Sequence, residues 1–154
     1  MITSMIITHN SIYGLCSIKQ DVKGITSIFF VKKTLVKKDL PVFDFTKKHK
    51  LNMQGTDFQK QVWKALLRIK KGQTKTYAEV AHMIGKPTAV RAVASAIAKN
   101  NIAVLVPCHR VIKSDGSTGE YRWGGSLKKK ILKSETSTKP SKIMYTTKYH
   151  ENSK

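Results

Sequence analysis

The chain of 154 residues is long enough to bury the core of one ordinary domain with a small companion, and too short for several large domains. With 40% hydrophobic and 25% charged residues, its composition is globular and excludes a disordered chain. A formal net charge of +20 favours a polyanionic partner such as nucleic acid, although a lysine-rich coding bias would produce the same total.

The two cysteines, Cys16 and Cys108, are too few for a disulfide-bonded scaffold, and no Cys/His pair has the spacing of zinc ligands. The first fifteen residues lack the features of a signal peptide, and no apolar run approaches membrane-spanning length. We therefore expect a cytoplasmic protein with no cofactor, no metal ion and no membrane partner.

Residues 1–54 contain short runs that alternate apolar and polar side chains, such as MIITHNSIYGLCSI and ITSIFFV. A period of two is typical of β-strands, so these runs predict a small N-terminal sheet. Pro41 and scattered lysines between residues 37 and 50 indicate a linker after the sheet.

The periodicity changes at Gly55, after which apolar residues recur at helical spacing. Thr56 begins TDFQ, a capping box in which a hydroxyl and a glutamine satisfy free backbone donors, and the helix that follows is expected to end at Gly72. Thr76 begins a second capping box, TYAE, before a short helix that Gly85 stops.

A third helix is expected over residues 88–99, and a short helix, a tight turn and a second helix form a helix-turn-helix outline. The face expected to point outward comprises Arg91, Ala92, Ser95, Ala96 and Lys99. Because small side chains dominate this face and Arg91 alone is long near the helix start, we expect DNA binding with little sequence preference. The alternative is that the alanines pack this helix against another part of the protein.

The chain after the third helix returns to short elements. Asn100 and Asn101 are expected to close that helix in left-handed geometry, and residues 102–106 then form a short buried strand. An amphipathic helix is expected over residues 127–135, with Lys128 to Lys130 on its solvated face.

The sequence thus divides into three parts. Residues 1–54 form a shortened N-terminal sheet domain with its linker, residues 55–135 form a DNA-binding helical domain, and residues 136–154 form a polar, lysine-rich tail.

The sequence LVPCHRV, residues 105–111, places Cys108 between a proline and a histidine. A buried spare thiol is the ordinary interpretation, whereas a nucleophilic thiolate needs an adjacent base or cation. His109 is the obvious base, and because neighbouring strand residues point to opposite faces, a bridging water is more plausible than direct contact. The histidine needs a group that orients it, and the downstream carboxylates that could serve are Asp115, Glu120 and Glu135.

Across residues 55–135 the chain resembles the methylated-DNA–protein-cysteine methyltransferases, or O6-alkylguanine-DNA alkyltransferases. The matching segments, in order, are GTDFQKQVWKAL, TYAEVA, GKPTAVRAVASAIAKN, VLVPCHRVI, SDG and EYRWGGSLKKKIL, followed by Glu135. The resemblance implies an α/β (α+β) fold: a ribonuclease H-like N-terminal sheet, here shortened, before a mostly helical domain with a winged-helix-like helix-turn-helix.

The resemblance also implies roles for individual residues. Cys108 would take the alkyl group from guanine O6 as a thioether, His109 would act on the thiol through a water, and Glu135 would fix the histidine. Asn100 would brace the turn beside the site. The residues implied to hold the nucleotide or the DNA are Tyr77, Arg91, Ile97, Val111, Tyr121, Arg122 and Lys128.

Within that second group, Tyr77 would rotate and hold the nucleotide, and Arg91 would fill the gap that a flipped base leaves in the duplex. Tyr121 and Ile97 would form the walls of the base pocket. The backbone carbonyls of Cys108 and Val111 and the amide of Arg122 would bind the base.

The expected function is therefore DNA repair by direct reversal. A monomer would act on double-stranded DNA that carries O6-alkylguanine or O4-alkylthymine, at the nucleoid if the organism is prokaryotic. Water cannot readily cleave a thioether, so each molecule would react once. The alternatives are a non-enzymatic helix-turn-helix module that senses lesions and, less favoured, a cysteine hydrolase, which would need an oxyanion hole.

Overall fold

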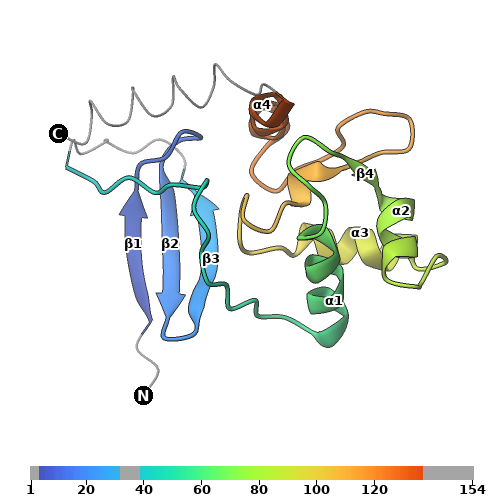
Figure 1. Cartoon of the computed structure of the whole chain (residues 1–154), viewed down its shortest axis with the longest axis horizontal. Helices are drawn as coiled ribbons and strands as arrows, with labels where there is room; N and C mark the ends of the chain where they lie inside the picture. Colours follow the sequence, from blue (N-terminus) through green and yellow to red (C-terminus); the bar gives the residue numbers. More distant parts are fainter. Residues whose placement is uncertain (1–3, 32–38, 137–154) are drawn as a thin grey trace.

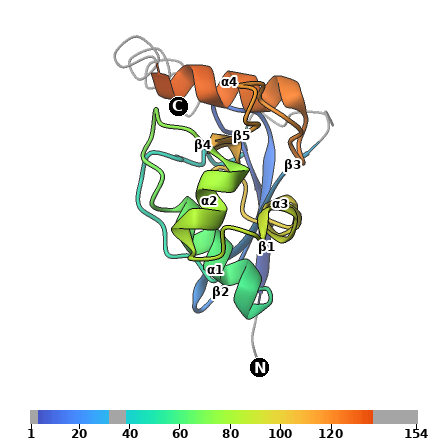
Figure 2. The ribbon, with the colours of Figure 1, turned by 90° about the vertical axis from the view of Figure 1, so that its right-hand side faces the viewer.

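The computed structural model describes residues 4–31 and 39–136. It places a small antiparallel sheet beside a group of helices (Figure 1), and helix α4 (Gly125–Thr136) lies across the top of the molecule as Figure 2 is drawn. Turning the molecule brings the helices to the front with the sheet behind them (Figure 2). The predicted α/β class is confirmed.

The N-terminal sheet has the strand order β1-β2-β3 and consists of β1 (Met5–His9), β2 (Cys16–Asp21) and β3 (Gly24–Phe30). Ile18 of β2 lies opposite Ile28 of β3, and both side chains are buried. Alternating apolar residues therefore build one covered face, as the period of two predicts.

Both predicted capping boxes are present. Thr56 and Gln59 exchange side-chain and backbone hydrogen bonds at the start of α1 (Asp57–Leu66), and Thr76 and Glu79 do so at the start of α2 (Tyr77–Met83). Each box satisfies backbone donors that a helix start leaves free.

The prediction that Gly72 ends the first helix was wrong, because α1 ends at Leu66. Beyond it, Arg68 and Ile69 donate to carbonyls three residues earlier, which tightens the chain into turns. These turns bury Ile69 in the core.

A short parallel pairing brings distant segments together next to the predicted nucleophile. Strand β4 (Lys75–Thr76) pairs with β5 (Val111–Ile112), which follows the 3-10 helix η1 (Cys108–Arg110). Because α2 begins immediately after β4, Tyr77 is placed beside the segment that carries Cys108.

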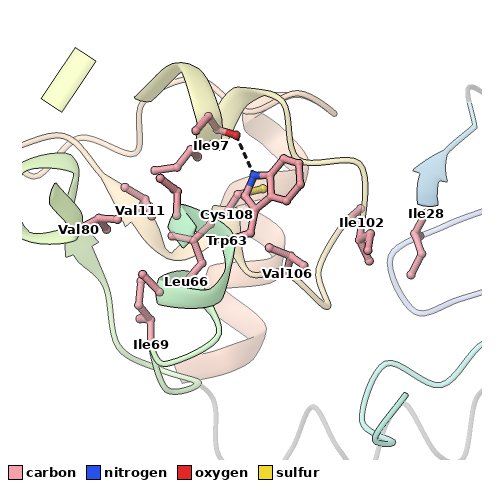
Figure 3. Close-up of a cluster of buried hydrophobic side chains, with 14 of the residues drawn as sticks. Ile28, Trp63, Leu66, Ile69, Val80, Ile97, Ile102, Val106, Cys108 and Val111 are labelled. Carbon is pink, nitrogen blue, oxygen red and sulfur yellow. Dashed lines mark hydrogen bonds between the residues drawn. The ribbon is translucent and has the colours of Figure 1, made fainter. Parts of the chain in front are cut away.

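The third helix, α3 (Val90–Ala98), packs more deeply than its sequence predicts. Ala96 was expected to face outward but is 2% exposed, because its carbonyl accepts a 2.8 Å hydrogen bond from Trp63 Nε1 (Figure 3). The Trp63 ring also packs so closely on Gly55 that a Cβ there would lie 2.5 Å from it. At Ala96, therefore, the third helix packs against another part of the protein, as the alternative interpretation of its alanines predicted.

Residues 102–106 do not form the predicted buried strand. They turn, with Val104 in left-handed geometry at φ 68°, because Asn100 folds the segment around its own side chain. Its amide oxygen accepts from the Ile102 amide at 2.9 Å, and its Nδ2 donates to the Val106 carbonyl at 3.0 Å. Asn100 and Asn101 are not left-handed, so that prediction was also wrong.

Helix α4 begins two residues earlier than predicted and includes Thr136, so only residues 137–154 of the predicted tail lie outside the described residues. Lys128 was expected on the solvated face but is 1% exposed, whereas Lys129 and Lys130 are exposed as predicted. Among the described residues, none of the helices has the length and apolar character needed to cross a membrane.

Candidate active site

Cys108 is the first residue of η1, directly after Pro107. Its amide donates to the Val106 carbonyl at 2.8 Å, which turns the chain sharply at the cysteine. The side chain is 5% exposed, and its sulfur lies within the cluster of buried hydrophobic residues that includes Trp63 and Ile97 (Figure 3). The sulfur is thus held in an apolar environment.

Asn100 contacts the sulfur directly. Its Nδ2 lies 3.1 Å from Cys108 Sγ, in position to donate a hydrogen bond. Burial raises the pKa of the Cys108 thiol, while the Asn100 hydrogen bond and the positive charges of Lys128 and Arg122 act to lower it. The role implied for Asn100, bracing the turn, fits this geometry, and the contact with sulfur adds a stabilising donor for a thiolate.

Behind the cysteine, His109 and Glu135 form a buried pair. His109 Nε2 lies 2.8 Å from Glu135 Oε1, and the carboxylate also accepts hydrogen bonds of 3.0 and 2.8 Å from Arg110. Arg110 is itself anchored by a 2.7 Å hydrogen bond to the Ile69 carbonyl. Of the three carboxylates left open by the sequence, Glu135 is the one that meets the histidine.

The protonation of this pair follows from its surroundings. Burial lowers the pKa of His109, although the hydrogen bond to Glu135 opposes this. Burial alone would raise the pKa of Glu135, but the hydrogen bonds from His109 and Arg110 outweigh it and lower the pKa to about 2. Near neutral pH the histidine is therefore neutral, the glutamate is charged, and Arg110 supplies the balancing charge.

In the neutral histidine the ring nitrogen facing the carboxylate must carry the proton, because a carboxylate can only accept. His109 Nδ1 is then an unprotonated base, and it is a buried atom without a hydrogen-bond partner among residues 4–31 and 39–136. No hydrogen bond joins His109 to Cys108 within these ranges, which agrees with the expectation that the two do not touch directly.

Lys128 reaches the same region from α4. Its Nζ donates to the Val111 carbonyl at 2.7 Å and lies 3.4 Å from the Glu120 carbonyl. Burial lowers the pKa of Lys128, and the charge of a Cys108 thiolate acts against this. The family resemblance implies that the Val111 carbonyl binds the base, and in this structure that carbonyl already accepts a hydrogen bond from Lys128.

A cavity of about 310 Å³ opens onto Cys108. This volume lies within the range of small-molecule binding sites. Its lining residues are Tyr77, Ala94, Ile97, Ala98, Cys108, Glu120, Tyr121 and Arg122. Five of the predicted site residues thus meet around one pocket, although they come from α2, α3, η1 and the loop before α4.

Two tyrosines of the pocket stay protonated. Burial raises the pKa of Tyr77 and that of Tyr121, and a Cys108 thiolate would raise both further. The Tyr121 hydroxyl is also buried beside Cys108 and has no partner other than that thiol in the described part of the chain. Both hydroxyls can therefore donate to an acceptor that enters the pocket.

Arg91 lies apart from this pocket. It is exposed near the start of α3, and its guanidinium makes no hydrogen bond or ion pair with residues that the structure describes. Asn100, His109, Val111, Lys128 and Glu135, by contrast, lie behind or beside the cysteine.

Sequence reasoning missed four residues of this arrangement. Arg110 holds Glu135, Ala94 and Ala98 line the pocket, and Glu120, considered only as an orienting carboxylate, lies on the pocket wall. The four-residue spacing of the two alanines around Ile97 was a usable signal, because such residues share one helix face. Across the described ranges, no group of three His, Cys, Asp or Glu side chains could hold a metal ion.

Residues 57–137 match the family described as 6-O-methylguanine DNA methyltransferase, DNA binding domain. The chain is 53% identical over 85 residues to the bifunctional transcriptional activator/DNA repair enzyme Ada of Escherichia coli, covering 55% of this chain and 24% of that protein. It is 55% identical over 86 residues to a methylated-DNA–protein-cysteine methyltransferase of Methanosarcina barkeri, covering 56% and 54%. The chain thus spans less than two thirds of either relative.

Among solved structures, the chain resembles Mycobacterium tuberculosis OGT in complex with DNA, with a TM-score of 0.74 and 33% identity. This match covers 90% of this chain and 96% of the other, so it includes the N-terminal sheet. A similar fold occurs in the O6-methylguanine-DNA methyltransferase of Pyrococcus kodakaraensis, at 20% identity and a TM-score of 0.59.

Proposed function

Because the chain belongs to the family of the 6-O-methylguanine DNA methyltransferase DNA-binding domain, we propose that it repairs O6-alkylguanine in double-stranded DNA by moving the alkyl group to Cys108. One observation carries this proposal: the Cys108 sulfur faces a cavity of about 310 Å³ on one side, while Asn100 and the His109–Glu135 pair support it from the other. We assign the site roles on this basis.

The thiol proton passes through a water to His109 Nδ1, the unprotonated nitrogen of the neutral ring. The thiolate, held by the Asn100 donor, then attacks the alkyl carbon. A sulfur–carbon bond forms, the carbon–O6 bond breaks, and its electron pair stays with the guanine. A pocket tyrosine, kept protonated because burial raises its pKa, can donate a hydrogen bond to the departing base, and the proton that His109 took from the thiol then neutralises the guanine through water and restores the neutral imidazole.

The reaction requires that the damaged nucleotide leave the base stack, because Cys108 is buried at a pocket and a base that stays within the duplex cannot bring its alkyl carbon to the sulfur. Tyr77, Ile97, Tyr121 and Arg122 line the pocket that receives the base. Arg91 enters the duplex in its place. The small outward residues of α3 allow close approach to DNA, which favours binding with little sequence preference.

The product is a thioether, which has no polarised carbonyl for water to attack. No second half-reaction restores the cysteine, so each monomer accepts one alkyl group without any cofactor. Because the substrate is DNA, the protein acts in the cytoplasm at the nucleoid if the organism is prokaryotic.

The test is the intact mass of the protein after incubation with a duplex that carries one O6-methylguanine. We expect a gain of one methylene mass, located on the Cys108 peptide and absent from Cys108→Ala. Cys16→Ala is the matched control, because Cys16 is also buried and burial raises its pKa to about 12, yet it lies in the N-terminal sheet. Tight binding to the lesion with no change in mass would instead favour the non-enzymatic lesion-sensing module.

A further inference from the structure

The Arg122 side chain connects the pocket wall to two other parts of the protein. Its Nη1 donates to the Asn100 carbonyl at 2.9 Å and to Asn101 Oδ1 at 2.8 Å. Its guanidinium carbon lies 4.7 Å from the centre of the Phe29 ring and 5.7 Å from that of Trp123. A planar cation is therefore held between the end of α3 and an aromatic ring of the N-terminal sheet.

Strand β3 is also tied by its backbone to the segment after α3. The Ile28 amide donates to the Asn101 carbonyl at 2.8 Å, and the Ala103 amide donates to the Ile28 carbonyl at 3.2 Å. Phe29 follows Ile28, so its ring is fixed at the junction between the sheet and the segment that holds Asn100. Backbone hydrogen bonds thus join the sheet to the segment that follows Asn100.

Aromatic contacts extend the same connection along the pocket loop. Trp123 meets Phe29 and Phe30 edge to face, with ring centres 5.8 and 6.4 Å apart. On its other side Trp123 meets Tyr121, a lining residue of the pocket, at 5.3 Å. The loop that carries Tyr121 and Arg122 therefore rests on the end of β3.

Arg122 borders two cavities at once. It lines the cavity beside Cys108 and also a second cavity of about 450 Å³, to which Gln54, Gln59, Lys99 and Asn101 contribute. Ala98 also lines both cavities, but Arg122 is the long side chain of the two, so its position affects how far the base pocket is closed toward the second cavity.

We propose that Phe29 is a positioning residue for alkyl transfer: it holds the Arg122 side chain so that the Tyr121–Trp123 loop forms a fixed outer wall of the base pocket. The N-terminal sheet then contributes to substrate capture and does more than support the fold. This inference rests on the proposed function and adds a residue from a part of the chain that supplies no lining residue of the pocket.

The proposal separates capture of the base from the chemical step. Phe29 is not among the residues that contact Cys108 Sγ, His109 or Glu135. Loss of the ring should therefore raise the substrate concentration for half-maximal rate and leave the rate at saturation nearly unchanged. A single cation–π contact at an exposed arginine such as Arg122 corresponds to about a 2- to 5-fold rise.

The test uses the whole chain and free O6-benzylguanine, which removes DNA binding from the measurement. Phe29→Leu keeps an apolar side chain but loses the aromatic face, whereas Phe29→Tyr keeps the face and should restore capture. Phe58→Leu is the matched control, because Phe58 is also half-buried under a cation, with Lys86 Nζ 5.2 Å from its ring centre, but it does not line the pocket.

A spectroscopic signature distinguishes positioning from loss of stability. The chain has four arginines, Arg68, Arg91, Arg110 and Arg122, so the Nε–H signals are readily assigned. The Arg122 signal should carry a ring-current shift that becomes smaller in Phe29→Leu, where only Trp123 remains near the guanidinium, and that keeps its size in Phe29→Tyr and Phe58→Leu.

If the Arg122 signal moves in Phe29→Leu but the half-saturating concentration does not, the proposal is overturned. Should that variant fail to fold, Asn101→Ala removes one of the two acceptors that hold Arg122 opposite Phe29, and unchanged capture in a variant whose Arg122 signal has moved would overturn the proposal equally. Failure of the wild-type protein to react at all would refute the proposed function itself, so the two failures are distinguishable.

Discussion

Glu135 Oε1 lies 2.8 Å from His109 Nε2, although the two residues are 26 positions apart. The same carboxylate is held by Arg110, so its charge is balanced without protonating the histidine. This relationship fixes the tautomer of His109 and leaves Nδ1 free to act as a base.

Glu135→Gln should slow alkyl transfer by about two orders of magnitude, since it removes the charge that orients His109 and supports its basicity. The single-turnover rate with O6-methylguanine duplex DNA measures this, and the reaction amplitude reports the folded fraction. Asp39 is an exposed carboxylate far in sequence from His109 and Glu135, so the control variant Asp39→Asn should react at the wild-type rate. An unchanged rate in Glu135→Gln would remove the histidine–glutamate pair from the mechanism.

Stability should fall as the solution is acidified from neutral pH, and both members of this pair contribute. The folded pKa of His109 lies below 6.5, so below about pH 6.5 the unfolded chain binds a proton that the folded protein does not. The folded pKa of Glu135 is about 2 against an ordinary 4.5, so its stabilisation is complete above about pH 4.5 and is lost as the pH falls toward 2.

Urea denaturation at about pH 7 and pH 5 tests the histidine part of this prediction. His109→Gln should reduce the difference in unfolding free energy between the two pH values. His82→Gln is the control, because His82 is exposed, and it should keep the wild-type difference. Equal differences in all three proteins would mean that His109 does not govern acid sensitivity.

Asn100→Ala should make Cys108 less reactive at neutral pH. Its hydrogen bond acts to lower the thiol pKa, so removing that bond raises the pKa and reduces the thiolate fraction. Loss of one charge-assisted hydrogen bond corresponds to about a tenfold lower rate near pH 7, with the rate profile displaced to higher pH.

The pH dependence of transfer to Cys108 measures this displacement. Asn52→Ala is the matched control, because the Asn52 amide binds Asp21 in the N-terminal sheet and should leave the profile in place. A slower reaction with an undisplaced profile would show that Asn100 braces the turn without acting on the thiol.

Arg91→Ala should slow repair in duplex DNA by about tenfold and leave the reaction with free O6-benzylguanine nearly unchanged. The reason is that Arg91 lies outside the pocket, and its side chain has a role only when a base has left the stack. Lys64→Ala removes an exposed cation from α1 and should affect both substrates little. Equal losses with both substrates would contradict a role for Arg91 in base flipping.

Much of the local structure could be predicted from short stretches of sequence. The capping boxes at Thr56 and Thr76 were predicted correctly because a helix start depends on residues within one turn of each other. The strands of the N-terminal sheet followed from alternation for the same reason.

The errors share one cause, which is contact between distant segments. Ala96 turned inward because Trp63 donates to its carbonyl across 33 positions, and Lys128 was buried because the Val111 carbonyl accepts from it across 17. Residues 102–106 turned because the Asn100 side chain replaced strand partners with its own hydrogen bonds. No periodicity in a single segment reports such partners.

The sequence by itself determined the chemical groups and the order of the elements: a cysteine beside a histidine, a nearly bare helix with one arginine, and helix starts with their caps. Only the tertiary structure decided which of three carboxylates meets His109, which residues close the pocket, and how the N-terminal sheet reaches Arg122. The physical reason is that capping and alternation act within a few residues, whereas a buried charge or ring is positioned by whatever the folded chain brings against it.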